Sequence, residues 1–421
     1  MSLKVLVSAY ACRPGEGSEP GIGWDVVREL AKYHDVWVLT RSNNRPSIEA
    51  EISLRPIPGL TFVYLDLPAW ARWWKRDQRG VQLHYYLWQV LAYSASQNLH
   101  REIHFDLAHH VTYVRYWGPS FVSLLPIPFI WGPVGGGESA PEAFCREFSW
   151  RGRTYERMRD LARWLGERDP FVPITAQRSV LARATTEDTA RRIRQLGAKT
   201  VQVYSQVGLS QAQIDELAVY ANGDRPPVRF ISIGRLLHWK GFHLGLKAFS
   251  QADLPAEAEY WIVGEGPERQ RLQALAEQLG IATQVRFLEK LPRPETLETI
   301  GQCLALVHPS LHESGGVVCV EAMAAGRPVI CLDLGGPAVQ VVEGTGFKIP
   351  PRNPEQSVQA IAAAMSHLAK DTDLWHQMSQ ACRKHVSDVY SWTVKGEKLA
   401  QLYQDIIDQQ KRSTNSYSVS P

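Results

Sequence analysis

Short apolar runs typical of β-strands alternate with helical patterns along most of this 421-residue chain, in two successive series. This order favours an α/β fold with parallel sheets, because each connection between parallel strands then passes through a helix. In the first series we expect strands at Val5–Tyr10, Val36–Thr40, Thr61–Asp66, Leu107–Val111, Phe129–Trp131, Leu181–Thr185 and Thr200–Tyr204. In the second series we expect them at Arg229–Ile233, Tyr260–Val263, Val285–Phe287, Ala305–His308 and Val329–Leu332.

The helical patterns between these strands complete two doubly wound units. The expected helices are Gly23–Tyr33 and Leu83–Glu102 in the first series, and Gly241–Ser250, Glu268–Leu279 and Gly316–Ala325 in the second. A polar, Pro-containing segment, Ala221–Pro227, marks a boundary between the two series. The sequence therefore predicts two Rossmann-like domains with a ligand cleft between them.

Composition bounds the class of protein. A hydrophobic share of 44% and a charged share of 21% are typical of a soluble globular chain. No apolar run approaches the roughly 20 residues that cross a bilayer, and Met1–Cys12 is too short and too weakly basic for a signal peptide. The six cysteines lack Cys-x-x-Cys spacing, which argues against a zinc site or a disulfide framework. We expect a cytoplasmic protein.

Charge is distributed unevenly along the chain. Residues 1–210 hold 26 Lys+Arg and 20 Asp+Glu, a balance of +6, whereas residues 211–421 hold 20 and 23, a balance of −3. The first half is therefore the expected side for an acidic partner.

The stretch His312–Gly326 carries two carboxylates, Glu313 and Glu321, with Gly315-Gly316 just after the first. An apolar helical run follows the glycines. A helix that begins there offers free backbone N–H groups and the positive end of its dipole to an anion. Ionised carboxylates on either side accept hydrogen bonds from hydroxyl groups. This pattern indicates a ligand with a diphosphate in the middle and a hydroxyl-rich group at each end.

A second motif, Gly234–Gly241, follows the first strand of the second series. Its Arg235 and Lys240 are five positions apart in a loop at the carboxyl end of a strand. Two cations placed in this way can converge on one diphosphate. A solvated basic turn is the alternative interpretation.

Together these motifs resemble the donor site of the retaining nucleotide-sugar glycosyltransferases of family 4, which have the GT-B fold. The resemblance rests on Glu-x7-Glu between "HPSLH" and "EAMAAGRPVI", on Gly-Arg-Leu-x3-Lys-Gly, and on the turn Val263–Pro267 between them. It implies that Glu321 holds the ribose, that Glu313 contacts the transferred sugar, and that Arg235 and Lys240 bind the donor diphosphate. Gly315 and Gly316 would place backbone N–H groups at the same diphosphate.

The segment Ser18–Trp24 contains Gly-Ile-Gly between the first strand and the first expected helix. Val26 stands where a dinucleotide-binding motif has its third glycine, and the next strand ends at Arg41 without a ribose-binding acid. These departures argue against a dinucleotide oxidoreductase. The family has a glycine pair here that lets backbone approach the donor phosphates, so the resemblance assigns Gly21 and Gly23 to that role.

Two histidines, His109 and His110, end an expected strand. The family has a histidine near this point that touches the transferred sugar and its acceptor. Because alternate residues of a strand point to opposite faces, one of the two is expected to be structural. We favour His110 as the catalytic one and keep His109 as the alternative.

A glycine-rich loop follows another strand of the first series, at Trp131–Glu138. We expect it to be flexible and to border the acceptor through Gly135 and Gly136. A plain turn is the competing interpretation.

Tryptophans and cations are interspersed in Pro68–Arg76 and again in Phe148–Arg168. Trp at a boundary between apolar and wet surroundings, beside basic residues, fits an anionic membrane surface or a polyanionic acceptor. Packing of the same tryptophans into the core is an equal alternative. Nothing else in the sequence supports nucleic-acid binding.

We therefore predict a retaining glycosyltransferase that moves a hexose from a nucleoside-diphosphate sugar, UDP favoured, to a saccharide or lipid-linked acceptor in polysaccharide or glycolipid assembly. Alternatives are transfer to a soluble phosphorylated sugar, as in sucrose-phosphate synthesis, and a sugar-nucleotide-binding protein without turnover. No metal or other cofactor is expected, since the first series lacks an Asp-x-Asp loop.

The expected architecture is GT-B, with two Rossmann-like domains facing a central cleft. The acceptor-side domain is expected at residues 1–208 and the nucleotide-sugar domain at 209–388. A C-terminal helix at 389–408 is expected to pack back on the first domain, and a polar tail at 409–421 to be disordered.

Overall fold

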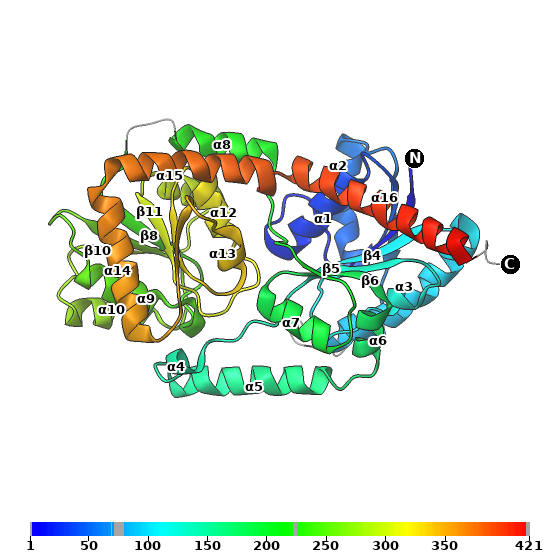
Figure 1. Cartoon of the computed structure of the whole chain (residues 1–421), viewed down its shortest axis with the longest axis horizontal. Coiled ribbons are helices and arrows are strands. Elements are labelled where there is room, and N and C mark those ends of the chain that lie inside the picture. The colour runs from blue at the N-terminus through cyan, green and yellow to red at the C-terminus, as the bar shows by residue number, and fades with distance from the viewer. Residues whose placement is uncertain (1, 69, 71–79, 222–224, 418–421) are drawn as a thin grey trace. The chain divides into compact units, whose positions relative to one another are not determined.

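The computed structural model describes residues 2–68, 70, 80–221 and 225–417. The chain divides into two compact units, shown in Figure 1. Unit 1 comprises Met1–Gly137, Leu161–Gln206 and Trp392–Pro421. Unit 2 comprises Glu138–Asp160 and Val207–Ser391. Helix α5 (Trp150–Gly166) contains the point at which the chain returns to unit 1.

The described part of unit 1 forms a seven-stranded parallel sheet in the order β3-β2-β1-β4-β5-β6-β7. The strands in this order are Leu60–Leu65, Asp35–Arg41, Lys4–Ala9, Leu107–Thr112, Phe129–Val134, Ser179–Ala184 and Val201–Val203. Its helices are α1 (Ser18–Leu30), α2 (Arg45–Leu54), α3 (Val81–Ile103), α6 (Phe171–Arg178), α7 (Glu187–Gln195) and α16 (Trp392–Tyr417).

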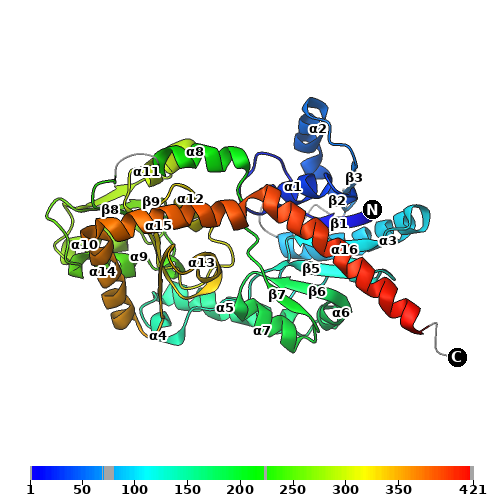
Figure 2. The same ribbon diagram turned by 45° about the horizontal axis from the view of Figure 1, so that its top comes forward.

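Apolar side chains on both faces of the unit 1 sheet explain this layering. In β1, Val5 and Val7 enter one core cluster with residues of α1 and α16, whereas Leu6 enters another with residues of α3. Central strands buried on both faces are typical of parallel sheets covered by helices. Helix α16 packs against α1, so the last helix of the chain covers the sheet of unit 1 (Figure 2).

The described part of unit 2 forms a six-stranded parallel sheet in the order β10-β9-β8-β11-β12-β13. The strands in this order are Val285–Leu288, Glu259–Val263, Arg229–Ile233, Ala305–His308, Val329–Leu332 and Gly346–Ile349. On one face lie α9 (Phe242–Gln251), α10 (Arg269–Gln278) and α14 (Pro354–Lys370), and on the other lie α8 (Gln211–Ala221), α11 (Arg293–Gly301) and α12 (Val317–Ala324) (Figure 1). Helix α15 (Thr372–His385) contributes buried residues to the core on both faces. Two short helices, α4 (Glu142–Cys145) and α13 (Gly335–Gln340), complete the unit.

Strand order reverses direction once in each sheet. In unit 1 the reversal lies between β1 and β4, and in unit 2 between β8 and β11. In doubly wound sheets, ligands bind beyond the carboxyl ends of the strands at such a reversal. In unit 2 the two loops at this point are residues 234–241, after β8, and residues 309–316, after β11. The fold therefore brings the two main sequence motifs to one edge of one sheet.

The two doubly wound units expected from the alternating pattern are confirmed. Several local expectations need correction. The first helix begins at Ser18 rather than Gly23, because Pro20 falls in the first turn, where a missing N–H costs no helical bond. Helix α2 was not expected. The segment Ala221–Pro227, whose residues 222–224 are outside the described ones, does not mark the boundary, since the chain returns to unit 2 at Val207. The chain from Gln409 continues as helix to Tyr417.

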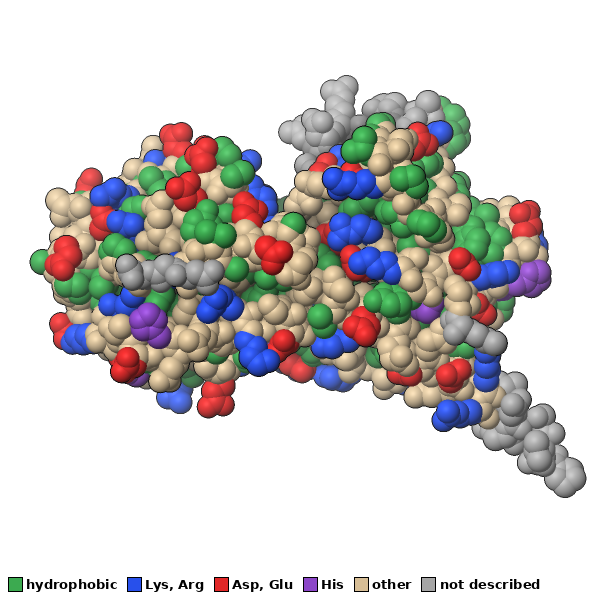
Figure 3. Space-filling view, turned by 90° about the horizontal axis from the view of Figure 1, so that it is seen from above, with side chains coloured by type: hydrophobic (Ala, Val, Ile, Leu, Met, Phe, Trp, Pro, Cys, Tyr) green, Lys and Arg blue, Asp and Glu red, His purple; other side chains and the backbone are tan. Residues whose placement is uncertain are grey.

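The uneven charge along the sequence does not produce a separate basic or acidic side on the face of the protein drawn in Figure 3. On the face drawn in Figure 3, basic and acidic side chains are interspersed on both units. Within residues 2–68, 70, 80–221 and 225–417, no helix has the length and apolar character needed to cross a bilayer.

Candidate functional site

The loop after β8 is shaped by close contacts between backbones. A β-carbon at Gly264 would overlap the carbonyl oxygen of Gly234, and one at Gly266 would overlap that of Leu236. The Leu236 N–H also donates to the Glu265 carbonyl, 2.8 Å away. The turn Val263–Pro267 therefore packs directly against the loop after β8. This close contact between backbones explains why positions 264 and 266 are glycines.

The loop after β11 is bonded directly to the loop after β8. The Leu311 N–H donates to the Trp239 carbonyl at 2.7 Å. Gly241 has a positive φ of 68° and leaves no room for a side chain beside the Pro309 carbonyl. The two loops therefore form one continuous surface at the carboxyl end of the sheet of unit 2.

Lys240 and Glu313 meet across these two loops. Lys240 Nζ lies 2.7 Å from Glu313 Oε2, and His308 Nε2 lies 2.8 Å from the same oxygen. Burial acts to raise the pKa of the Glu313 carboxyl, but the neighbouring His308 and Lys240 outweigh it and hold that pKa well below its ordinary value. Glu313 is therefore ionised at neutral pH and prepared to accept hydrogen bonds.

Arg235 is exposed, and among the described residues only its backbone has a hydrogen bond, from the Leu237 N–H to the Arg235 carbonyl. It stands one residue after Gly234, on the same loop as Lys240. An exposed guanidinium on a held loop can turn toward an anion without loss of an existing ion pair. The same loop thus carries Lys240, which is paired with Glu313, and Arg235, whose exposed side chain can bind an anion.

Helix α12 begins directly after Gly315 and Gly316, as expected. Gly316 has a φ of 87°, which favours glycine, and Gln340 Nε2 donates to the Gly315 carbonyl at 2.6 Å. The N-terminus of α12 therefore points its first N–H groups and its positive dipole end to the edge that carries the loops after β8 and β11.

Glu321 lies in the second turn of α12, and its side chain is 5% exposed. Arg293 Nη1, at the start of α11, lies 2.6 Å from Glu321 Oε1. Because the Arg293 side chain is 46% exposed, it can move aside when another donor approaches the carboxylate. Arg235, Lys240, Glu313, Gly315, Gly316 and Glu321 thus all lie in unit 2, in the loops after β8 and β11 and in α12.

Gly21 and Gly23 lie within α1 of unit 1, not in a loop before it. Side chains at these positions would overlap the backbone carbonyls of Glu16 and Ala11 respectively. Their glycine identity is therefore explained by close packing at the start of the helix. Their expected contact with donor phosphates stays a prediction.

His109 and His110 point to opposite faces of β4, as alternation requires. His109 contacts Tyr403 of α16 and the Gly132 carbonyl, whereas His110 contacts Tyr85 of α3. Both side chains are buried, and burial lowers the pKa of His109 to about 3 and that of His110 to about 4. Both imidazoles are neutral at neutral pH.

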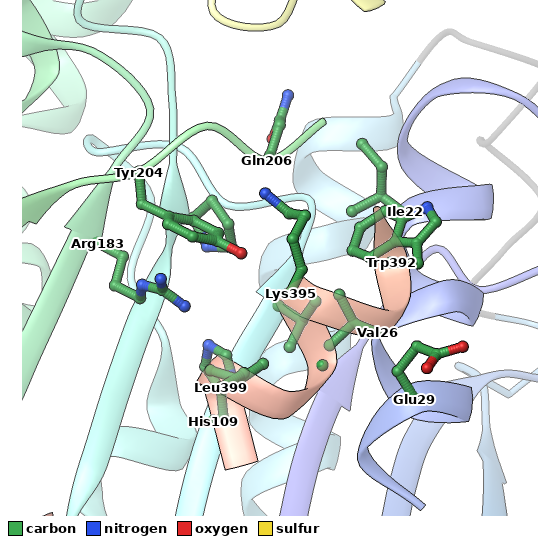
Figure 4. Close-up of a pocket in the computed structure, with 13 residues that line it drawn as sticks. Ile22, Val26, Glu29, His109, Arg183, Tyr204, Gln206, Trp392, Lys395 and Leu399 are labelled. Atoms are coloured by element: carbon green, nitrogen blue, oxygen red, sulfur yellow. The ribbon is translucent and has the colours of Figure 1, made fainter. Parts of the chain in front are cut away.

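A small pocket in unit 1 includes His109 in its lining. Figure 4 shows His109, Arg183 and Tyr204 around this pocket together with Lys395, which comes from α16. The guanidinium carbon of Arg183 lies 3.4 Å and Lys395 Nζ 3.9 Å from the centroid of the Tyr204 ring. His109 therefore belongs to a buried polar cluster of unit 1, and a sugar contact from it stays a prediction.

Gly135 and Gly136 are held firmly, which corrects the expectation of a flexible loop. Gly135 exchanges backbone hydrogen bonds with the segment after β4, through Val114 and Tyr116. Gly136 has a φ of 95° and packs against Trp117. An acceptor contact by this loop stays a prediction.

Of the tryptophan-rich segment Pro68–Arg76, the tryptophans Trp73 and Trp74 lie outside the described residues. Trp70 is described, and it is 78% exposed. In α5, Trp150 and Trp164 are exposed as well. These three tryptophans are not packed into the core.

Four side chains at the site had no assigned role in the sequence: His238, His308, His312 and Glu156. His238 and His312 stand within the two motif loops and His308 ends β11 directly before one of them, so their closeness in sequence to Lys240 and Glu313 was the available signal. Glu156 gave no such signal, because it lies about 80 residues before the nearer loop in the sequence.

Residues 221–385 match the sequence model of the family described as Glycosyl transferases group 1. A D-inositol 3-phosphate glycosyltransferase of Corynebacterium urealyticum is 36% identical over 184 residues, which are 41% of this chain and 42% of that protein. A glycogen synthase of Mycobacterium tuberculosis is 28% identical over 179 residues, 42% of each chain. The chain thus matches less than half the length of these curated relatives.

Solved structures cover nearly the whole chain. Sucrose-phosphate synthase from Thermosynechococcus elongatus superposes with a TM-score of 0.63 at 16% identity, over 97% of this chain and 100% of that one. Anabaena Alr3699/HepE in complex with UDP and glucose gives 0.58 at 17% identity, over 96% and 100%. At this identity the likeness shows the fold alone, and that fold is GT-B, as the sequence resemblance implied.

Proposed function

Because residues 221–385 of this chain belong to the glycosyl transferases group 1 family, we propose that the protein is a retaining glycosyltransferase. It takes a hexose from a nucleoside-diphosphate sugar, UDP favoured, and transfers it to an acceptor hydroxyl. The observation that carries the proposal is the meeting of Lys240 with Glu313 across the two loops of unit 2, 2.7 Å apart.

The donor fits this site by charge and by hydrogen-bonding type. Lys240 and Arg235 bind the diphosphate as cations, and the N-terminus of α12 with Gly315 and Gly316 adds backbone N–H donors. Glu321 accepts from the ribose hydroxyls. Glu313 accepts from hydroxyls of the transferred sugar, which fits its ionised state beside His308 and Lys240.

Charge stabilisation of the leaving group is the chemistry that these residues supply. As the bond from the anomeric carbon to the diphosphate oxygen breaks, negative charge grows on the diphosphate beside Lys240 and Arg235. The acceptor oxygen forms its bond to the anomeric carbon on the same face. The hydroxyl proton passes to the departing diphosphate oxygen. Two protein cations do the work that a divalent metal does in other transferases, so no metal is required.

Residues of unit 1 are proposed to contact the donor phosphates, the transferred sugar and the acceptor. We assign Gly21 and Gly23 to the donor phosphates and Gly135 and Gly136 to the acceptor side, on the family resemblance. His110, with His109 as the alternative, would contact the transferred sugar. Both imidazoles are buried and hydrogen-bonded within unit 1.

For the acceptor we propose a saccharide or lipid-linked saccharide of polysaccharide or glycolipid assembly, used in the cytoplasm at the inner face of a membrane. The support is the exposure of Trp70, 78%, in a segment rich in tryptophan and cations. Transfer to a soluble phosphorylated sugar is the competing outcome.

A direct assay tests the proposal. The purified protein is incubated with UDP-, ADP- and GDP-hexoses, first alone and then with lipid-linked, oligosaccharide and phosphorylated-sugar acceptors. We expect slow donor hydrolysis, faster transfer with one acceptor class, and a product with the donor's anomeric configuration by NMR. Inversion of configuration contradicts the retaining mechanism. Tight nucleotide-sugar binding without turnover on any acceptor would show a binding protein instead of an enzyme.

A further inference from the structure

The segment Glu138–Asp160 follows β5 of unit 1 in the sequence but belongs to unit 2. We call it the inserted segment. Three glutamates, nine positions apart, attach it there. Glu138 accepts from Ser314, Glu147 bonds His243 and Lys247, and Glu156 bonds His238 and His312.

Glu156 joins the two loops of the proposed donor site. Its Oε1 lies 3.0 Å from Nε2 of His238 and 3.0 Å from Nε2 of His312. His238 stands two residues before Lys240, and His312 immediately precedes Glu313. One carboxylate oxygen thus holds the loop that carries the cation and the loop that carries the acid.

An aromatic stack strengthens the same junction. The Trp239 ring lies between the rings of Tyr155 and His312, with centroids 5.0 Å and 5.2 Å away and interplanar angles of 12° and 18°. Tyr155 is the neighbour of Glu156 on α5, so the inserted segment contacts the loop after β8 through Tyr155 as well, and Trp239 in turn stacks on His312 of the loop after β11. Near-parallel rings at these distances attract each other and restrict rotation of the side chains.

Close packing leaves little freedom where α5 passes His238. A β-carbon at Gly152 would lie 3.0 Å from the His238 ring, and Phe148 contacts that ring edge-on at 4.7 Å. Gly152 and Phe148 of the inserted segment therefore pack against the His238 ring and restrict its position, in addition to the hydrogen bond with Glu156.

The charge of Glu156 suits this role. Burial acts to raise the pKa of its carboxyl, but His238, His312 and Arg159 outweigh it and hold that pKa far below its ordinary value. An ionised carboxylate accepts two hydrogen bonds at one oxygen, and charge makes each of them stronger. The side chain is 13% exposed, so solvent weakens these bonds little.

We propose that Glu156 is a positioning residue of the donor site. It touches no substrate, and it fixes the separation of Lys240 and Glu313 by holding His238 and His312 together. The proposal rests on the proposed function, since it concerns the same site. It adds that the donor site of unit 2 is incomplete without a segment that lies in the sequence among the elements of unit 1.

The inserted segment offers a matched control. Glu147 bonds a histidine and a lysine of α9, as Glu156 bonds two histidines, but α9 carries neither Lys240 nor Glu313. Hydrogen bonds from His243 and Lys247 outweigh the effect of burial and lower the pKa of Glu147 to about 2, so it too is ionised. Glu147→Ala therefore removes a comparable attachment of the segment without disturbing the junction of the two loops.

The experiment compares Glu156→Ala, Glu156→Gln and Glu147→Ala by titration calorimetry and steady-state kinetics. The probe is whichever of UDP, ADP and GDP the wild-type protein binds, with the corresponding sugar donor for turnover. For Glu156→Ala we expect the nucleotide Kd and donor KM to rise roughly ten-fold, in the range seen when supporting residues of a site are removed. Glu147→Ala should lower the melting temperature but change Kd and KM less than two-fold.

Glu156→Gln separates positioning from a general structural effect. Its amide oxygen still accepts from both imidazoles without the charge, so it should recover most of the affinity that Glu156→Ala loses. Equal Kd values for Glu156→Ala and Glu147→Ala would overturn the proposal. Arg235→Ala distinguishes failure of the proposed function from failure of the positioning role of Glu156. If the wild type binds no nucleotide, the proposed function fails. If Arg235→Ala weakens binding while Glu156→Ala does not, the positioning role alone fails.

Discussion

Lys240 Nζ lies 2.7 Å from Glu313 Oε2, so the cation assigned to the donor diphosphate is already held by the carboxylate assigned to the sugar. Both groups are less than a quarter exposed. The pair satisfies two opposite charges within the protein. A donor that binds here would share Lys240 with Glu313, since an ammonium has three N–H donors.

The ribose role of Glu321 gives the first prediction. Glu321→Gln keeps the shape of the side chain but loses hydrogen bonding to a charged acceptor, worth about 1.5–3 kcal/mol. Nucleoside diphosphate affinity, measured by titration calorimetry, should fall roughly ten-fold or more. Glu295→Gln, which changes an exposed carboxylate on the neighbouring helix α11, serves as the control. Unchanged affinity in Glu321→Gln would remove the ribose assignment.

The second prediction concerns pH and stability. Because the folded-state pKa of Glu313 is depressed, its ion pairs stabilise the protein fully above the ordinary carboxyl pKa of about 4.3. This stabilisation is lost as pH falls through the lower folded-state value, at about 1.4 kcal/mol per pH unit. The gap in unfolding free energy between wild type and Glu313→Gln should therefore narrow between pH 5 and pH 3, as followed by urea unfolding. A gap that is constant over this range would show that Glu313 is not held ionised.

The third prediction concerns metal ions. Arg235 and Lys240 supply two positive charges to the diphosphate, so the transfer rate should be unchanged by EDTA. The assay compares untreated protein, EDTA-treated protein, and treated protein with magnesium or manganese restored. Loss of activity with EDTA and its return with either metal would refute charge neutralisation by the two side chains alone.

The fourth prediction concerns membranes. Trp70 is 78% exposed in a segment that also carries Arg72, Lys75 and Arg76. Each cation near an anionic bilayer contributes about 1 kcal/mol, and the effect weakens with salt. We expect salt-sensitive co-sedimentation with anionic liposomes, reduced in Trp70→Ala and in Trp73→Ala/Trp74→Ala, and none with neutral liposomes. Wild-type protein that stays in the supernatant at low salt would favour a soluble acceptor.

The sequence predicted the doubly wound architecture because the strands of both units are short apolar runs separated by helical patterns. It also predicted that Arg235, Lys240 and Glu313 lie in loops at one sheet edge of unit 2 and Glu321 in the helix that follows, whereas the donor contacts of these residues stay predictions. Local pattern is sufficient there, because parallel strands place their following loops side by side.

Contacts between residues far apart in the sequence could not be predicted from local sequence patterns. The attachment of Glu138–Asp160 to unit 2 depends on Glu–His pairs, such as Glu156 with His238, between residues about 80 positions apart. The sequence around Glu156 does not predict a contact with His238, and the sequence around His238 does not predict one with Glu156. For α1, glycines at positions 21 and 23 suggested a loop, whereas close backbone packing is what requires them.

The central claim is that the two loops at the strand reversal of unit 2 bind a nucleoside diphosphate through Arg235 and Lys240. Titration calorimetry of UDP, ADP and GDP with wild type, Arg235→Ala, Lys240→Ala and the double variant tests it most directly. We predict that one nucleotide binds the wild type, that each single variant weakens binding at least ten-fold, and that the double variant shows no measurable binding. The melting temperature should stay nearly constant in Arg235→Ala, whose side chain is exposed, and should fall in Lys240→Ala, which leaves Glu313 without its lysine. Wild-type affinity in the folded double variant would contradict the account.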